Sequence, residues 1–240
     1  MAYRGPVTSD SPTGLNADLQ RYFAPGSHRG RTTEAVTDAL REAILDGVLP
    51  STTWLREDEI ASIFAVSRTP VREALRRLAD EGLATKTANH GTAVAPLSIE
   101  DILALYVVRE NLEGLDARLA AATARPELVD RLNEIGSEMR FAAEQADVPA
   151  LVRLNLDWHR ALREASGNTY LGRFLNQVEH AVRRLPSSTL AQPGRAEQVL
   201  AEHDAVVRAI ENGNADAAQQ AASAHMHRAR EIRLSVLLGV

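Results

Sequence analysis

The sequence predicts a mainly α-helical protein of two domains, an N-terminal winged helix-turn-helix and a C-terminal, all-helical antiparallel bundle. Three observations support this prediction. Two short amphipathic segments joined by a tight turn lie between residues 57 and 81, a candidate β-hairpin follows them, and apolar residues recur at helical spacing beyond Ile99. We expect a mobile tail over residues 1–28, the first domain over 29–97, and the second over 98–240.

The composition is typical of a packed protein from a reducing compartment. Of the 240 residues, 45% are hydrophobic and none is cysteine, which excludes disulfides and cysteine-ligated metals. No stretch approaches the roughly 20 apolar residues of a membrane span, and Met1 to Gly30 lacks the apolar core of a signal peptide. We therefore expect a cytoplasmic protein without a membrane partner. The net charge of -5 does not exclude DNA binding, because basic residues are concentrated locally.

Helix signals divide the first domain into three helices. The expected helices run from Thr32 or Thr33 to Leu45, from Glu57 to Phe64, and from about Ser67 to Glu81. Gly47 follows the first helix as a stop signal, and Ala65-Val66 turns the chain from the second helix into the third. The last two helices therefore form a candidate helix-turn-helix.

The third of these helices has the two faces of a DNA recognition helix. Its apolar face comprises Val71, Ala74, Leu75 and Leu78, and its basic face comprises Arg68, Arg72 and Arg76. Arginine is well suited to a bidentate contact with guanine in the major groove, so Arg68 and Arg72 are the expected base readers. Ser67 and Thr69 can donate to phosphates, and Ser67 can also cap the helix. The alternative is that the basic face is only a solvated surface.

A β-hairpin wing is expected after the recognition helix. Residues 83–87 and 92–95 flank Asn89-His90-Gly91, the residue types that a tight turn favours. His90 and the Gly91 backbone are expected to approach the DNA from this wing. Beyond Pro96, breaks near Pro126, Pro149, Gly167, Pro186 to Gly194, and Gly213 divide the second domain into about six helices.

Three motifs in the first domain carry a resemblance to a known family. They are Leu55-x-Glu57-x-x-Ile60-Ala61, Val66-Ser67-Arg68-Thr69-Pro70-Val71-Arg72-Glu73-Ala74-Leu75, and Gly91-x-x-Val94. Together they closely resemble the winged-helix domain of the GntR superfamily, which implies that Arg68, Thr69, Arg72, His90 and Gly91 touch DNA. One departure is Ala65, where the family commonly has Gly. If this position is left-handed, Ala costs on the order of 1 kcal/mol.

The second domain carries further motifs, Arg109-x-x-x-Glu113, the segment from His159 to Leu171, Glu202-His203, and His225. They resemble the all-helical effector domain (FCD type) of the FadR-like subgroup. The resemblance implies a divalent metal, zinc or nickel, on Asn155, His159, His203 and His225, with Asn155 replacing the usual carboxylate. It also places Arg109 in an effector cavity, to grip a ligand carboxylate. The alternatives are that each His is hydrogen-bonded separately and that Arg109 merely pairs with Glu113.

The two resemblances together predict a homodimeric transcription regulator, a repressor, that binds a palindromic operator in double-stranded DNA. The expected effector is a small organic acid or related metabolite bound in the helical domain. One alternative is a metal-dependent enzyme that uses His159, His203 and His225, although the sequence contains no Gly-x-Ser-x-Gly motif, phosphate loop or nucleotide-binding glycine fingerprint. Another is a sensor whose output is a protein partner.

Overall fold

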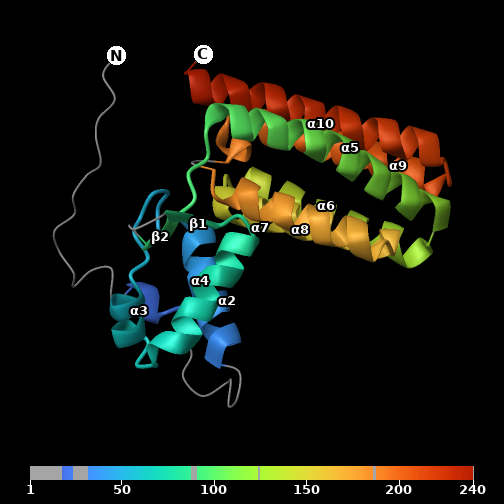
Figure 1. Ribbon diagram of the computed structural model, residues 1–240. Helices are drawn as coiled ribbons and strands as arrows, with labels where there is room; N and C mark the ends of the chain where they lie inside the picture. The colour runs from blue at the N-terminus through green and yellow to red at the C-terminus, as the bar shows by residue number, and fades with distance from the viewer. Residues whose placement is uncertain (1–17, 24–31, 88–90, 124, 186–187, 240) are drawn as a thin grey trace. The chain divides into compact units, whose positions relative to one another are not determined.

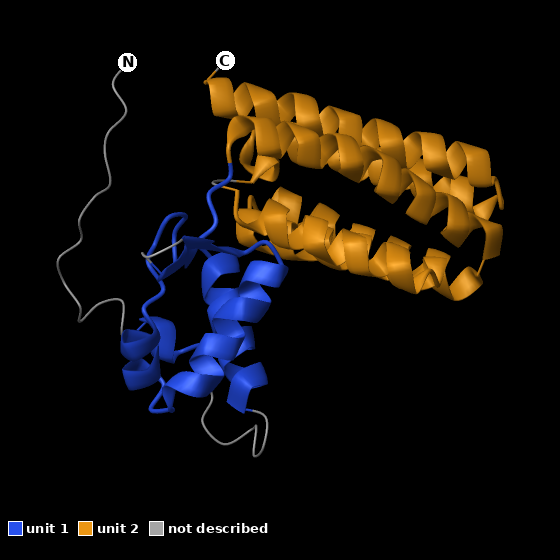
Figure 2. Cartoon of the chain, in the orientation of Figure 1, with its two compact units in different colours: residues 1–97 blue, residues 98–240 orange. Residues whose placement is uncertain are grey.

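The computed structural model describes residues 18–23, 32–87, 91–123, 125–185 and 188–239. The chain divides into two compact units, unit 1 over Met1–Leu97 and unit 2 over Ser98–Val240 (Figure 2). Within the described ranges, none of the helices combines the length and the apolar character needed to cross a bilayer.

Unit 1 is a winged helix-turn-helix, as the sequence predicts. Its described part includes the helices α2 (Thr32–Leu45), α3 (Glu57–Ile63) and α4 (Arg68–Asp80), followed by a hairpin of β1 (Ala84–Thr87) and β2 (Gly91–Val94) (Figure 1). The two strands are antiparallel, with Ala84 opposite Val94 and Thr87 opposite Gly91. The observed helix bounds lie within one residue of the predicted ones.

The core of unit 1 is built on the predicted apolar face of α4. Val71, Ala74, Leu75 and Leu78 are all buried and pack with α2 residues such as Val36 and Leu40. Because one face of α4 is held in this core, its opposite face remains available to solvent.

A short segment of the predicted mobile tail also belongs to this core. Leu19 is buried, and the ring of Phe23 stacks on Phe64 with centroids 4.6 Å apart. The amide of Gln20 donates to the carbonyl of Ile63, and the hydroxyl of Tyr22 donates to Asp46. The prediction of a mobile tail therefore does not hold for residues 18–23, because their apolar side chains cover the core of unit 1. The rest of residues 1–28 lies outside the described part of the chain.

Unit 2 is an all-helical bundle, as predicted. Its α-helices are α5 (Ile99–Thr123), α6 (Pro126–Glu144), α7 (Val148–Ser166), α8 (Thr169–Arg183), α9 (Arg195–Glu211) and α10 (Ala215–Leu238), and a short turn η1 (Thr189–Ala191) precedes α9. In Figure 1, α5, α9 and α10 form one layer, and α6, α7 and α8 form the other. The predicted breaks coincide with the helix ends: Asp147 caps α7, and Asn168 caps α8.

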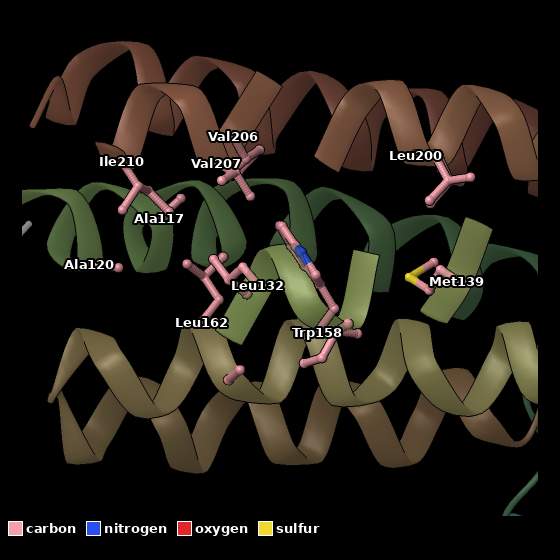
Figure 3. Close-up of a cluster of buried hydrophobic side chains, with 14 of the residues drawn as sticks. Ala117, Ala120, Leu132, Met139, Trp158, Leu162, Leu200, Val206, Val207 and Ile210 are labelled. Atoms are coloured by element: carbon pink, nitrogen blue, oxygen red, sulfur yellow. The ribbon is translucent and has the colours of Figure 1, made fainter. Parts of the chain in front are cut away.

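The core of unit 2 lies between these two layers. Trp158 on α7 is its largest fully buried side chain and lies among Leu132, Leu162 and Val206 (Figure 3). Apolar packing of this kind fixes the positions of the helices, and it therefore fixes the polar side chains that the same helices carry inward.

Ala65 provides a stability test for unit 1. Its φ is 52°, in the left-handed region. This conformation agrees with the Gly that the GntR superfamily commonly has at this position. Ala65→Gly should raise the free energy of unfolding by about 0.5–1 kcal/mol, because relief of the left-handed strain exceeds the added entropy of the unfolded chain. Urea denaturation followed by circular dichroism measures this change. As a control, Ala79→Gly inside α4 should lower stability by about 1 kcal/mol. A loss of stability in Ala65→Gly would contradict the claim that Ala65 is strained in its left-handed conformation.

Candidate DNA-binding surface and candidate metal centre

The N-terminal turn of α4 presents the predicted DNA-contacting residues to solvent. Ser67, Arg68 and Thr69 are exposed, and Gly91 is exposed at the start of β2 with a φ of 99°. Ser67 occupies the N-cap position in an extended conformation, but its side chain makes no capping hydrogen bond, contrary to the prediction. Its hydroxyl is therefore left to solvent or to a ligand. The predicted contact of His90 lies outside the described residues.

Arg68 and Arg72 are both paired with acidic residues at the start of α3. The Arg72 guanidinium donates through Nε and Nη2 to the carboxylate of Glu57, at 3.1 Å and 2.9 Å. Arg68 Nε lies 2.9 Å from Asp58, and its Nη2 lies 3.5 Å from Glu57. The hydrogen bonds from Arg72 lower the pKa of Glu57, so this carboxylate is ionised at neutral pH. No local pattern in the sequence indicated these pairs.

Three histidines converge in the interior of unit 2. His159 of α7, His203 of α9 and His225 of α10 are buried, and each offers a ring nitrogen within 4.8 Å of the others. These are three of the four residues that the resemblance implied as metal ligands. The fourth, Asn155, lies one helical turn before His159 on α7 and is half-buried.

Two carboxylates orient two of these imidazoles. Oε2 of Glu202 lies 2.5 Å from Nδ1 of His225, and Oε2 of Glu113 lies 2.9 Å from Nδ1 of His159, the latter without hydrogen-bond alignment. Because each Nδ1 faces a carboxylate, Nε2 is the atom left for a ligand in both rings. His203 instead stacks on Trp158 with centroids 3.8 Å apart.

Each of these carboxylates is held in turn by a buried arginine. Arg195 binds both oxygens of Glu202, at 2.7 Å and 2.8 Å, and Arg109 donates to Oε1 of Glu113 at 2.9 Å. The pairing of Arg109 with Glu113, one of its two predicted roles, is thus present. Glu202 was named only as part of a motif and Arg195 was not named, because the partner His225 lies on another helix and Arg195 lies two turns before Glu202.

Both units match families of known proteins. Residues 32–94 match the family described as bacterial regulatory proteins, gntR family, and residues 104–228 match the FCD domain. The chain belongs to the GntR family.

Relatives of this GntR protein are transcription regulators. It is 32% identical to the "Probable D-xylose utilization operon transcriptional repressor" of Paenarthrobacter nicotinovorans, over 82% of this chain and 87% of that protein. Escherichia coli McbR/YncC shares the fold, with a TM-score of 0.70 at 18% identity over 86% of this chain and 98% of that one. A GntR-type protein of Rhodococcus sp. RHA1, at 25% identity, has a TM-score of 0.64 over 86% and 99% of the two chains. The protein is therefore a DNA-binding transcription regulator and not an enzyme.

Burial favours the neutral form of His203 and His225 in this GntR regulator. Burial lowers the pKa of His203 well below its ordinary value and lowers the pKa of His225 to about 4, although the Glu202 hydrogen bond opposes the second shift. Burial alone would raise the pKa of Glu113, but His159 and Arg109 together lower it. Neutral imidazole is the form that binds metal ions.

Asp116 on α5 is a further buried ionisable group that the sequence analysis missed. It is fully buried, and neither of its oxygens has a hydrogen-bond partner among the described residues. Ser166 lies near it, but the Ser166 hydroxyl donates to the carbonyl of Arg163. Burial raises the pKa of Asp116 to about 7. The signal in the sequence was the helical spacing of Arg109, Glu113 and Asp116 along one face of α5.

Asp116 makes the stability of unit 2 dependent on pH. Its pKa is raised from 3.8 to about 7 in the folded protein, so stability present below about pH 4 is lost as the pH rises towards 7. Asp116→Asn removes this loss and should stabilise the protein at pH 8 by on the order of 2–4 kcal/mol, with little gain near pH 4. Unfolding in urea from pH 4 to pH 8 measures the difference. Asp130→Asn on the exposed side of α6 is the control, and a gain independent of pH would contradict a neutral Asp116.

Proposed function

We propose that this GntR regulator is a repressor that binds a palindromic operator as a homodimer and is released by a small organic acid bound in unit 2. The observation that carries the DNA-binding part is the exposure of Arg68 and Arg72, one helical turn apart, at the start of α4. A recognition helix places this end at the base edges of the major groove.

The proposed division of labour on DNA follows from side-chain chemistry. Arg68 and Arg72 read guanines through their guanidinium forks, while the hydroxyls of Ser67 and Thr69 donate to phosphates. His90 and Gly91 approach from the wing. One helix reads a short half-site, so two copies of the chain on a two-fold symmetric operator double the contacts.

The chemistry of the histidine cluster fits a resident divalent metal. Both ring nitrogens of the buried His203 lack a hydrogen-bond partner among the described residues, and so does Nε2 of His159. Unpartnered buried polar atoms are costly, and a cation would satisfy one nitrogen of each ring. Three imidazoles suit zinc or nickel, with Asn155 or water completing the ligands. We propose His159, His203 and His225 as the principal ligands.

The proposed effector is a carboxylate, because the surroundings of the cluster attract anions. A metal on three neutral imidazoles keeps its positive charge, and the Nη groups of Arg109 are not needed for the bond that its Nε makes to Glu113. A related protein of Bacillus licheniformis, 25% identical over 78% of this chain and 79% of that one, is named the gluconate operon transcriptional repressor. Gluconate is an acid of this class. The effector acts by binding more tightly to the state that does not fit the operator.

Arg72→Ala tests the proposed reading of bases. A duplex selected by the wild-type protein from random sequences serves as the operator, and fluorescence anisotropy gives its Kd. Loss of a bidentate guanine contact should raise this Kd by about ten- to a hundredfold. Arg76→Ala removes the same charge from an exposed position of α4 and should weaken binding less. Equal losses in the two variants would contradict a base-reading role for Arg72.

Glu202→Gln tests the metal centre. Loss of the carboxylate that orients His225 should lower zinc affinity by about ten- to a hundredfold, measured by competition with a chromophoric chelator. Glu179→Gln is the matched control, because Glu179 is a carboxylate of unit 2 that pairs with Arg160 and Arg163 instead. Zinc affinity that is equal in both variants and wild type would show that the metal lies elsewhere.

A further inference from the structure

The two arginines proposed to read DNA share one carboxylate. Glu57, in the first turn of α3, accepts from Nε and Nη2 of Arg72 and also lies 3.5 Å from Nη2 of Arg68. The Glu57 side chain is only 28% exposed, whereas those of Arg68 and Arg72 are 58% and 62% exposed. The carboxylate is therefore a partly buried anchor for Arg72 and, together with the exposed Asp58, for Arg68, and it is contributed by the other helix of the helix-turn-helix.

The geometry of the Arg72 guanidinium leaves its distal edge open. A guanidinium carries five N–H donors, and Glu57 takes those on the edge formed by Nε and Nη2. The edge formed by Nη1 and the second hydrogen of Nη2 donates to no acceptor among the described residues. This edge is the fork that matches O6 and N7 of guanine. Arg72 can thus keep Glu57 and bind a base at the same time.

A held arginine discriminates bases better than a free one. An unrestrained arginine side chain loses rotamer freedom on binding and can also swing to the nearest phosphate, which carries no sequence information. A carboxylate beside the guanidinium opposes that second outcome, because it repels phosphate. The same carboxylate restrains the Arg72 side chain before DNA arrives, so less rotamer freedom is lost on binding.

We propose that Glu57 is a specificity-determining residue of this regulator, which holds Arg72 and Arg68 at the base edges and away from the phosphates. The proposal rests on the proposed role of Arg72 as a base reader. Glu57 acts through the two arginines, so it is a positioning residue, and its removal changes selectivity more than affinity.

The test compares two dissociation constants for each full-length variant, one for the duplex selected by the wild type and one for a scrambled duplex of equal length and composition. Their ratio is the specificity. Glu57→Gln should lower this ratio by about tenfold, with binding to the scrambled duplex unchanged or tighter. A second selection from random sequences should show weaker preference at the guanine positions.

Glu73→Gln is the matched control, because Glu73 is also in unit 1, carries the same charge and pairs with an exposed arginine, Arg76. It should change both constants alike and leave the ratio within about twofold of wild type. Glu57→Asp keeps the charge but shortens the reach, and it should also lower the ratio. Circular dichroism establishes that each variant is folded.

The outcomes separate this inference from the proposed function. A wild-type ratio in Glu57→Gln and Glu57→Asp, together with a reduced ratio in Arg72→Ala, overturns the role of Glu57 alone. A wild-type ratio in Arg72→Ala overturns the base-reading role itself. An equal fall of the ratio in Glu57→Gln and Glu73→Gln also overturns the inference, because it assigns the effect to net charge.

Discussion

Burial of three imidazoles in unit 2 is the constraint on which that unit depends. His159, His203 and His225 come from three helices, and the carboxylate of Glu113 reaches the cluster from a fourth. A buried polar group without a partner costs about 1–3 kcal/mol, so whatever satisfies these nitrogens stabilises the bundle as a whole. A ligand held by the three imidazoles would therefore join three helices directly and the fourth through Glu113, so that small changes there would alter how the helices pack.

Unit 1 has the opposite arrangement, because its polar function lies at the surface and its interior is apolar. The buried face of α4 fixes the helix axis, and Glu57 then limits where Arg72 can point. Rigid packing thus determines the position of the helix, while an ion pair determines the orientation of the side chain that it presents. Exposed ion pairs add little to stability, so the value of this one is in orientation.

The sequence predicted the elements that depend on local signals. The face of α4, the stops near Gly167 and Gly213 and the hairpin all follow from spacing and turn chemistry. The convergence of the histidines followed only from resemblance, since helical spacing within one helix cannot show which helices face each other. Other features depend on tertiary contacts, so no local pattern could have indicated them. They are the contact of Glu57 with Arg72, the chain of contacts from Arg195 through Glu202 to His225, and the packing of residues 18–23.

X-ray absorption spectroscopy of the zinc-loaded protein tests the central claim most directly. Outer-shell scattering reports imidazole rings around the metal, and the His203→Ala variant serves as the comparison. The arrangement of His159, His203 and His225 predicts a shell of nitrogen and oxygen atoms at about 2.0–2.1 Å with scattering from three imidazoles, one of which is lost in the variant. A shell without imidazole scattering, or one unchanged in His203→Ala, would contradict a metal centre at the buried cluster.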